Sequence, residues 1–298
     1  MDDRDTRTAD DRREADRRSI GPNTEERKSA AVRSAIRTEL GVDDRARPRR
    51  QRDPDALIVE VDHVSLSFDV PILEDVSFSA RDGETIAIVG ESGTGKSTIL
   101  KLLLRLLVPD RGRVLIDGED ITDLTFEEAL LVRQKMGMVF QGAALFDSMT
   151  VFENVAYPLR EHTQMDEDEI EERVKEKLQF VDLDADRVVD QFPSELSGGM
   201  RKRVGIARGM ANNAEIMLYD EPTSGLDPLT TNTITRLIMK LQRELGVTSV
   251  VVSHDIRSVF RMASRVALLH DRRITFLGTP EEMTASEDTY IQDFLGGA

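Results

Sequence analysis

The chain has 298 residues and a formal net charge of −16, and residues 57–298 carry 25 basic and 42 acidic side chains. So acidic a surface repels nucleic acid, which argues against DNA or RNA as a partner. The lack of cysteine excludes disulfides and thiolate metal sites. No apolar run reaches the roughly 18 residues of a membrane-spanning helix. We therefore expect a soluble chain that meets a membrane only through partners.

The N-terminal segment, residues 1–55, is rich in Arg and Asp and nearly free of large apolar side chains. It cannot bury enough surface to offset the entropy lost on ordering, so we predict a disordered, charged extension. Its first residues lack the apolar region of a secretory signal. One short helix is compatible with the pattern, because Asn23 and Glu26 fit a capping box and apolar residues recur every four positions from Val32 to Leu40.

The rest of the chain, residues 56–298, is predicted to form one α/β domain. Several short apolar runs are separated by helical stretches, as parallel βαβ units require. A helix is expected from about Lys96 to Leu107, and the helical, charged stretch between Val151 and Phe192 predicts a helical subdomain at about residues 148–196. The expected strands are Leu57–Phe68, Ile72–Ala80, Glu84–Val89, Val114–Ile116, Met136–Phe140, Ile216–Tyr219, Ser249–Val252 and Arg265–Leu269.

A phosphate-binding pattern, G-x-x-x-x-G-K-[ST], lies between an expected strand and an expected helix. Its glycines let backbone N–H groups curl toward phosphate oxygens, and the helix N-terminus adds a positive dipole end. Lys96 would bring a full charge to the β- and γ-phosphates, and the Ser97 hydroxyl can ligate Mg²⁺. The residues expected to bind ATP here are Gly90, Glu91, Ser92, Gly93, Thr94, Gly95, Lys96, Ser97 and Thr98.

A second pattern is the apolar run Ile216–Tyr219, which ends in two carboxylates, Asp220 and Glu221. Adjacent residues of a strand point to opposite sides, so the two acids are expected to serve different partners. Asp220 is assigned to Mg²⁺, and Glu221 to the attacking water as general base. In isolation such a pair is more often a solvated strand end; in a chain with a phosphate loop it indicates a Walker B motif.

A third pattern, Leu196-Ser-Gly-Gly-Met200, precedes an expected helix that runs to about Ala211. The Ser197 hydroxyl and the backbone N–H groups of Gly198 and Gly199 would form a second anion site at a helix start. An ordinary helix cap with two turn glycines is the alternative for this segment alone.

The order of these three motifs resembles the ABC ATPase family, and the resemblance covers residues 57 to about 295. It implies a P-loop NTPase core with an antiparallel β subdomain and a helical subdomain, Mg²⁺-dependent ATP hydrolysis, and a homodimer in which Ser197–Gly199 of one subunit closes on ATP held by the other. It also implies that Gln141 reaches toward Mg²⁺ and the membrane partner, that His254 acts catalytically on the γ-phosphate together with Lys96 and Glu221, and that Phe68 stacks on adenine. Core packing is the alternative for Phe68, and a surface histidine for His254.

A narrower resemblance concerns the cargo. The stretch from Phe140 to His162, the methionine Met200, and the ending Phe294-Leu-Gly resemble the ATPase subunits of Mce-type (Mla-type) lipid transporters. This implies a cytoplasmic subunit held on the inner membrane by a permease, with a Mce-domain lipid-binding protein in the complex and phospholipid as cargo. An ATPase for another small solute, or a non-transport ABC ATPase, is the alternative. The long N-terminal extension departs from a minimal subunit of this type.

The acidity of the chain has two explanations. Arg outnumbers Lys by 32 to 8, so a GC-rich genome with an ordinary acidic surface accounts for the composition. Adaptation to a salty cytoplasm accounts for it as well, because excess acidic charge keeps proteins soluble and monomeric.

Overall fold

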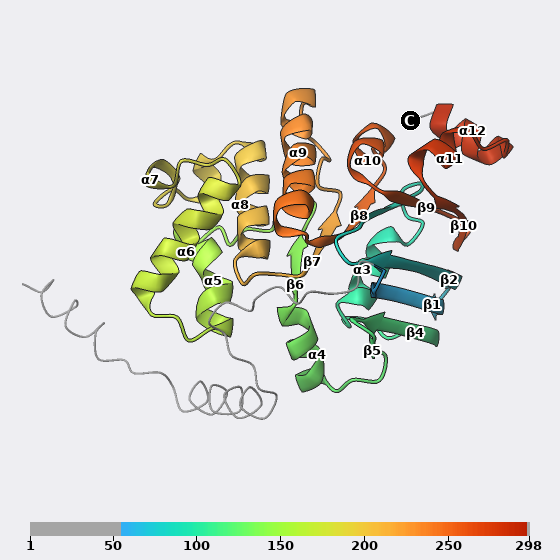
Figure 1. Cartoon of the computed structure of the whole chain (residues 1–298), viewed down its shortest axis with the longest axis horizontal. Coiled ribbons are helices and arrows are strands. Elements are labelled where there is room, and N and C mark those ends of the chain that lie inside the picture. The colour runs from blue at the N-terminus through green and yellow to red at the C-terminus, as the bar shows by residue number, and fades with distance from the viewer. Residues whose placement is uncertain (1–54, 297–298) are drawn as a thin grey trace, which may run out of the picture. The chain divides into compact units, whose positions relative to one another are not determined.

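The computed structural model describes residues 55–296, which form two β-sheets and the helices packed on them (Figure 1). Apart from Asp55, the predicted disordered extension and the predicted helix between Asn23 and Leu40 lie outside the described residues. None of the helices in this described part is long and apolar enough to cross a membrane.

The smaller sheet is antiparallel and has the strand order β2-β1-β4-β5. Its strands are β1 (Leu57–Ser67), β2 (Pro71–Arg81), β4 (Arg111–Ile116) and β5 (Glu119–Asp120). Its buried side chains, such as Val59 and Phe78, share one apolar cluster with Ile99 and Leu103 of helix α3 (Lys96–Leu103) and with Ile86 of the larger sheet. Helix α3 therefore packs against both sheets, which fixes the position of its N-terminus.

The larger sheet has six strands in the order β10-β9-β3-β8-β7-β6 and is parallel except for the edge strand β10. Its strands are β3 (Thr85–Val89), β6 (Met136–Val139), β7 (Ile216–Asp220), β8 (Thr248–Ser253), β9 (Arg265–His270) and β10 (Arg273–Gly278). The central strands β3, β7 and β8 are almost continuously buried, as expected for parallel strands covered on both faces. Because their carboxyl ends lie at one edge, the loops that follow them meet there.

Two groups of helices lie on opposite sides of the larger sheet's other helices (Figure 1). Helices α5, α6 and α7 gather beside α8, whereas α11 and α12 lie near β9 and β10. Their bounds are α4 (Phe126–Gln134), α5 (Val151–His162), α6 (Glu167–Phe180), α7 (Ala185–Val188), the 3₁₀ turn η1 (Pro193–Glu195), α8 (Gly198–Met210), α9 (Pro228–Leu245), α10 (Ile256–Met262), α11 (Pro280–Thr284) and α12 (Thr289–Gly296).

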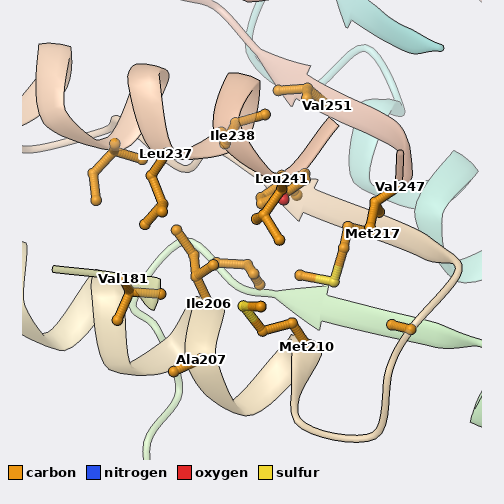
Figure 2. Packing of buried hydrophobic residues seen from close by; sticks show 14 of the residues in the cluster. Val181, Ile206, Ala207, Met210, Met217, Leu237, Ile238, Leu241, Val247 and Val251 are labelled. Atoms are coloured by element: carbon orange, nitrogen blue, oxygen red, sulfur yellow. The ribbon is translucent and has the colours of Figure 1, made fainter. Parts of the chain in front are cut away.

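The second apolar cluster lies on the other face of the larger sheet. Figure 2 shows side chains of α8 and α9 meeting over β7, among them Ile206, Met210, Leu237 and Leu241 around Met217. All five are at most 3% exposed. This packing joins α8 rigidly to the sheet whose strand ends form the site described below.

The predicted fold class is confirmed, since the structure combines a parallel sheet, an antiparallel sheet and a cluster of helices. Every expected strand is present within a few residues of its predicted ends. Helix α3 ends at Leu103 rather than near Leu107, and Arg105 just after it has a left-handed backbone with φ 52°. The predicted limits of the domain and of its helical subdomain remain predictions.

Candidate functional site

A pocket of about 390 Å³ opens at the carboxyl ends of the parallel strands. It gathers residues from segments that are far apart in the sequence, because the loops after β3, β6, β7 and β8 converge there. The residues that line it are Phe68, Ile72, Ser92, Gly93, Gly95, Lys96, Ser97, Thr98, Gln141, Asp220, Glu221 and His254. The phosphate-loop pattern and the Asp220-Glu221 pattern thus meet in one place, together with Phe68, Gln141 and His254.

The loop between β3 and α3 depends on glycine at two positions. Gly90 has φ 153°, and a Cβ atom there would lie 2.3 Å from the carbonyl oxygen of Leu269. Gly95 is the N-cap of α3 with φ 101°, and no side chain caps the helix there. The positive end of the α3 dipole therefore faces the pocket, an arrangement that favours a phosphate.

Lys96 is buried, and its ammonium lies over this loop. Nζ donates to the carbonyl oxygens of Gly90 at 2.8 Å and Glu91 at 2.7 Å. Burial lowers the pKa of Lys96, while the carboxylates of Glu221, Asp220 and Glu91 raise it. A cation that pays for burial in this way is stabilised by an anion placed beside it, so the pocket favours a phosphate ligand.

The residues predicted to hold Mg²⁺ all line the pocket. The Ser97 hydroxyl donates to Oδ1 of Asp220 at 2.9 Å, and the Gln141 amide nitrogen donates to the Ser224 hydroxyl at 3.3 Å. Residues 55–296 contain no group of three or more His, Asp or Glu side chains that could hold a metal without help. One hydroxyl and one carboxylate fit Mg²⁺, which commonly completes its shell with water and substrate phosphates.

Glu221 and His254 contact each other just after the carboxyl ends of β7 and β8. Nδ1 of His254 lies 2.8 Å from Oε2 of Glu221, and the backbone N–H of His254 donates to the same oxygen at 3.4 Å. The backbone N–H of Glu221 donates to the Val252 carbonyl at 2.9 Å. His254 thereby orients the Glu221 carboxylate, and β8, which ends just before His254, fixes the Glu221 backbone.

The expectation that Asp220 and Glu221 point to opposite sides of a strand is wrong. Strand β7 ends at Asp220, and Glu221 has a left-handed backbone with φ 50°. The turn brings both carboxylates into the same pocket. They still have different partners, Ser97 for Asp220 and His254 for Glu221, but the backbone turn rather than strand alternation separates them.

The third motif, Leu196–Met200, lies away from the pocket. Ser197 caps α8, and its hydroxyl accepts a hydrogen bond from the Met200 backbone at 3.2 Å. Gly199 lies against α9, where a Cβ atom would come within 2.4 Å of Cγ2 of Thr230. Ser197, Gly198 and Gly199 do not line the pocket of their own chain, so the structure does not bring this motif to Lys96.

Within the phosphate loop, Gly90, Glu91 and Thr94 shape the backbone without lining the pocket. The Thr94 hydroxyl donates to the Glu91 carbonyl at 2.9 Å. Phe68, by contrast, lines the pocket and is 61% exposed, which excludes the core-packing alternative for this ring. An open aromatic face is available for stacking on a base.

Two residues near the site were not predicted. Ile72 lines the pocket beside Phe68, and the alternation of its strand was the only signal for it. Tyr290 of α12 donates its hydroxyl to Oε1 of Glu91 at 3.2 Å and stacks on His270, with 3.6 Å between ring centroids. The sequence contains no signal for the Tyr290 contact, because it joins residues 199 positions apart.

Comparison with known proteins adds family and relatives to this geometry. Residues 73–224 match the family described as ABC transporter. The intermembrane phospholipid transport system ATP-binding protein MlaF of Escherichia coli K12 is 41% identical over 226 residues, which span 76% of this chain and 83% of that protein. The probable ribonucleotide transport ATP-binding protein mkl of Mycobacterium tuberculosis H37Rv is 40% identical over 245 residues, which span 82% of this chain and 68% of that protein.

Solved structures of two ATP-binding cassettes are also similar. The dimeric cassette MJ0796 in a post-hydrolysis state with ADP and Pi has a TM-score of 0.70 and 35% identity, covering 75% of this chain and 99% of its own. The protein cbiO1 of Clostridium perfringens, part of the ABC transporter complex cbiONQ, has a TM-score of 0.72 and 29% identity, covering 81% of this chain and 96% of its own.

Proposed function

Since this chain belongs to the ABC transporter family, we propose that it is the ATP-hydrolysing subunit that energises phospholipid transport between the inner and outer membranes. Nucleotide binding and ATP hydrolysis are properties of the family, in agreement with the ADP-bound and Pi-bound neighbour. The observation that carries the cargo is the 41% identity to a phospholipid transport ATP-binding protein over 83% of its length.

The pocket supports in-line attack of water on the γ-phosphate of ATP. The Lys96 ammonium and the loop N–H groups bind the phosphate oxygens and hold the charge that develops on them. Mg²⁺, when bound by Ser97 and Asp220, would supply further positive charge to those oxygens. Phe68 stacks on adenine from the exposed rim of the pocket.

Glu221 is the general base of this proposal. Its carboxylate orients the attacking water and accepts a proton from it as the bond to the γ-phosphorus forms and the bond to ADP breaks. His254 holds Oε2 of Glu221 through Nδ1, which aims the other carboxylate oxygen. His254 and Gln141 line the same pocket, and in this proposal His254 contacts the terminal phosphate while Gln141 reaches toward Mg²⁺.

A second copy of the chain completes the site in this proposal. Ser197, Gly198 and Gly199 present a helix start with a serine cap, yet they lie outside the pocket of their own chain. The MJ0796 neighbour is dimeric. These observations support a homodimer in which each Ser197–Gly199 segment binds ATP held by the partner subunit.

The permease is proposed to bind the surface formed by the segment after Gln141 and by α5. Phe146 is 42% and Tyr157 is 41% exposed, and their ring centroids lie 5.2 Å apart. Leu145, Met149 and Phe152 are half-buried there, whereas Val151 lies fully in the core. An exposed aromatic pair over partly buried apolar residues suits an apolar partner surface, and such a partner would hold the subunit on the cytoplasmic face of the inner membrane.

A second cargo is supported by one observation, the 40% identity to a probable ribonucleotide transport ATP-binding protein. The two cargo assignments are distinguished by isolating the full chain with its membrane partners. Mass spectrometry then identifies the proteins and the bound small molecules. We expect a multi-span permease, a Mce-domain protein and phospholipid. A receptor protein for a soluble solute, with no phospholipid in the extract, would refute the lipid assignment and leave the ATPase assignment standing.

A further inference from the structure

The pocket rests on a buried lysine that the mechanism above does not use. Lys202 lies on α8, shortly after the Ser197–Gly199 segment, and is 5% exposed. Its ammonium donates to the main-chain carbonyl of Gln141 and, at 3.1 Å, to the main-chain carbonyl of Glu221. One side chain thus joins the helix of the third motif to the two loops that carry Gln141 and Glu221.

Both loops have backbone conformations that need support. Glu221 has φ 50°, and Ala143 and Ala144, which follow Gln141, have φ 64° and 46°. A left-handed conformation at a non-glycine residue is strained and persists only where the surroundings fix it. Lys202 binds directly to Glu221 and to the residue two positions before Ala143, so it is placed to supply that support.

The same face of α8 holds the rest of the Gln141 segment. Residues three positions apart share a helix face, and Arg208 lies two such steps beyond Lys202. Arg208 donates to the carbonyls of Ala144 at 2.8 Å and Ala143 at 2.9 Å. At the intermediate step, a Cβ atom on Gly205 would lie 3.2 Å from Cβ of Ala143. Helix α8 therefore fixes the segment through the side chains of Lys202 and Arg208 and through close packing at Gly205.

Packing alone does not account for a lysine at this position. An apolar side chain would fill the space, whereas an ammonium loses hydration and needs acceptors to compensate. Burial lowers the pKa of Lys202, and the nearby carboxylates of Glu221 and Asp220 raise it. The two carbonyl oxygens are its direct partners, so the buried ammonium stabilises the relative position of the two loops.

We propose that Lys202 is a positioning residue for ATP hydrolysis, which fixes the backbone of Glu221 against that of Gln141 and so keeps the Glu221 carboxylate aimed into the pocket. The inference rests on the general-base role proposed above for Glu221. Lys202 does not line the pocket, so its loss acts on the rate of the chemical step and leaves nucleotide binding intact.

The test compares Lys202→Met, Lys202→Gln and the control Lys177→Met in the purified full chain. Lys177 is also a buried lysine, 4% exposed, but it lies on α6 and bonds to Glu176 and Asn213 away from the pocket. Steady-state hydrolysis gives kcat and KM for Mg·ATP, and circular dichroism melting reports folding. Lys202→Met is expected to lower kcat about tenfold or more at unchanged KM. Lys177→Met should keep the wild-type kcat.

Lys202→Gln keeps an N–H donor on a shorter side chain, so its kcat should lie between those of Lys202→Met and the wild type, again at unchanged KM. This variant decides the matter if Lys202→Met does not fold. Wild-type kcat in either folded Lys202 variant, or an equal loss in Lys177→Met, would overturn the inference.

Glu221→Gln measured in the same assay separates two failures. If Glu221→Gln loses turnover and Lys202→Met does not, only the positioning role of Lys202 fails. If Glu221→Gln keeps near-normal turnover, the general-base role fails and the role of Lys202 fails with it.

Discussion

Each carboxylate of the pocket has its own partner. Asp220 accepts from the Ser97 hydroxyl, and Glu221 is held by His254 and by a left-handed backbone that turns it into the pocket. The separation matters for chemistry, because a metal ligand must stay ionised and coordinated while a general base must be free to take a proton.

Glu221→Gln should reduce ATP turnover by about 10²–10⁴-fold, the usual contribution of general-base catalysis. The amide keeps the shape of the side chain but cannot accept the proton, so Mg·ATP binding should persist and an ATP-bound dimer should accumulate. Phosphate release and size-exclusion chromatography with ATP report the two effects. Glu127→Gln, on exposed α4, is the control and should behave as wild type. Near-normal turnover in Glu221→Gln would refute the assignment.

Lys96→Ala should weaken nucleotide binding itself. The buried ammonium is the cation closest to the phosphate loop, and charge-assisted hydrogen bonds contribute about 1.5–3 kcal/mol each. The Kd for Mg·ATP, measured by calorimetry, should therefore rise at least about tenfold. Lys101→Ala removes an exposed lysine from the same helix and should leave the Kd unchanged. An equal Kd in Lys96→Ala and wild type would contradict the placement of phosphate at this loop.

Helix α8 connects three parts of the structure. Its start carries Ser197, its buried face packs with α9 over β7, and its cationic face holds the segment after Gln141. The guanidinium carbon Cζ of Arg208 also lies 5.7 Å from the centre of the Phe146 ring, at the surface proposed for the permease. A partner that presses on Phe146 therefore acts on a segment already fixed to α8.

Phe146→Glu should abolish copurification of the permease while leaving the Kd for Mg·ATP unchanged. A carboxylate in place of the exposed ring costs desolvation in an apolar contact. Leu277→Glu is the matched control, because Leu277 is 41% exposed on β10, outside this surface. If both variants retain the permease, the docking surface lies elsewhere.

The sequence predicts the strands and the three motifs well, for a physical reason. Strands β3, β7 and β8 are buried on both faces, so they are apolar runs bounded by turns. The contacts that it fails to predict depend on distant packing. The backbone of Glu221, the reach of Lys202 to two loops, and the bond from Tyr290 to Glu91 leave no local pattern.

For the whole molecule, charge is the largest departure from an ordinary domain. Residues 57–298 carry 42 acidic and 25 basic side chains, so self-repulsion weakens the compact state at low ionic strength. Added salt shortens the Debye length from about 10 Å at 0.1 M to about 3 Å at 1 M. Tm should therefore rise with KCl up to molar concentrations. NaCl at equal ionic strength should give the same rise if screening is the cause. A flat or falling Tm would leave the base composition of the genome as the explanation for the acidic charge.

We expect ATP hydrolysis by this chain to drive the movement of phospholipid. This coupling can be measured by reconstituting the chain with its copurified membrane partners in liposomes that contain a labelled phospholipid, and by following the label after Mg·ATP is added. The phospholipid should move in an ATP-dependent manner with the wild-type chain and should not move with Glu221→Gln. ATP hydrolysis without phospholipid movement, in a preparation that transports a labelled ribonucleotide, would contradict this expectation.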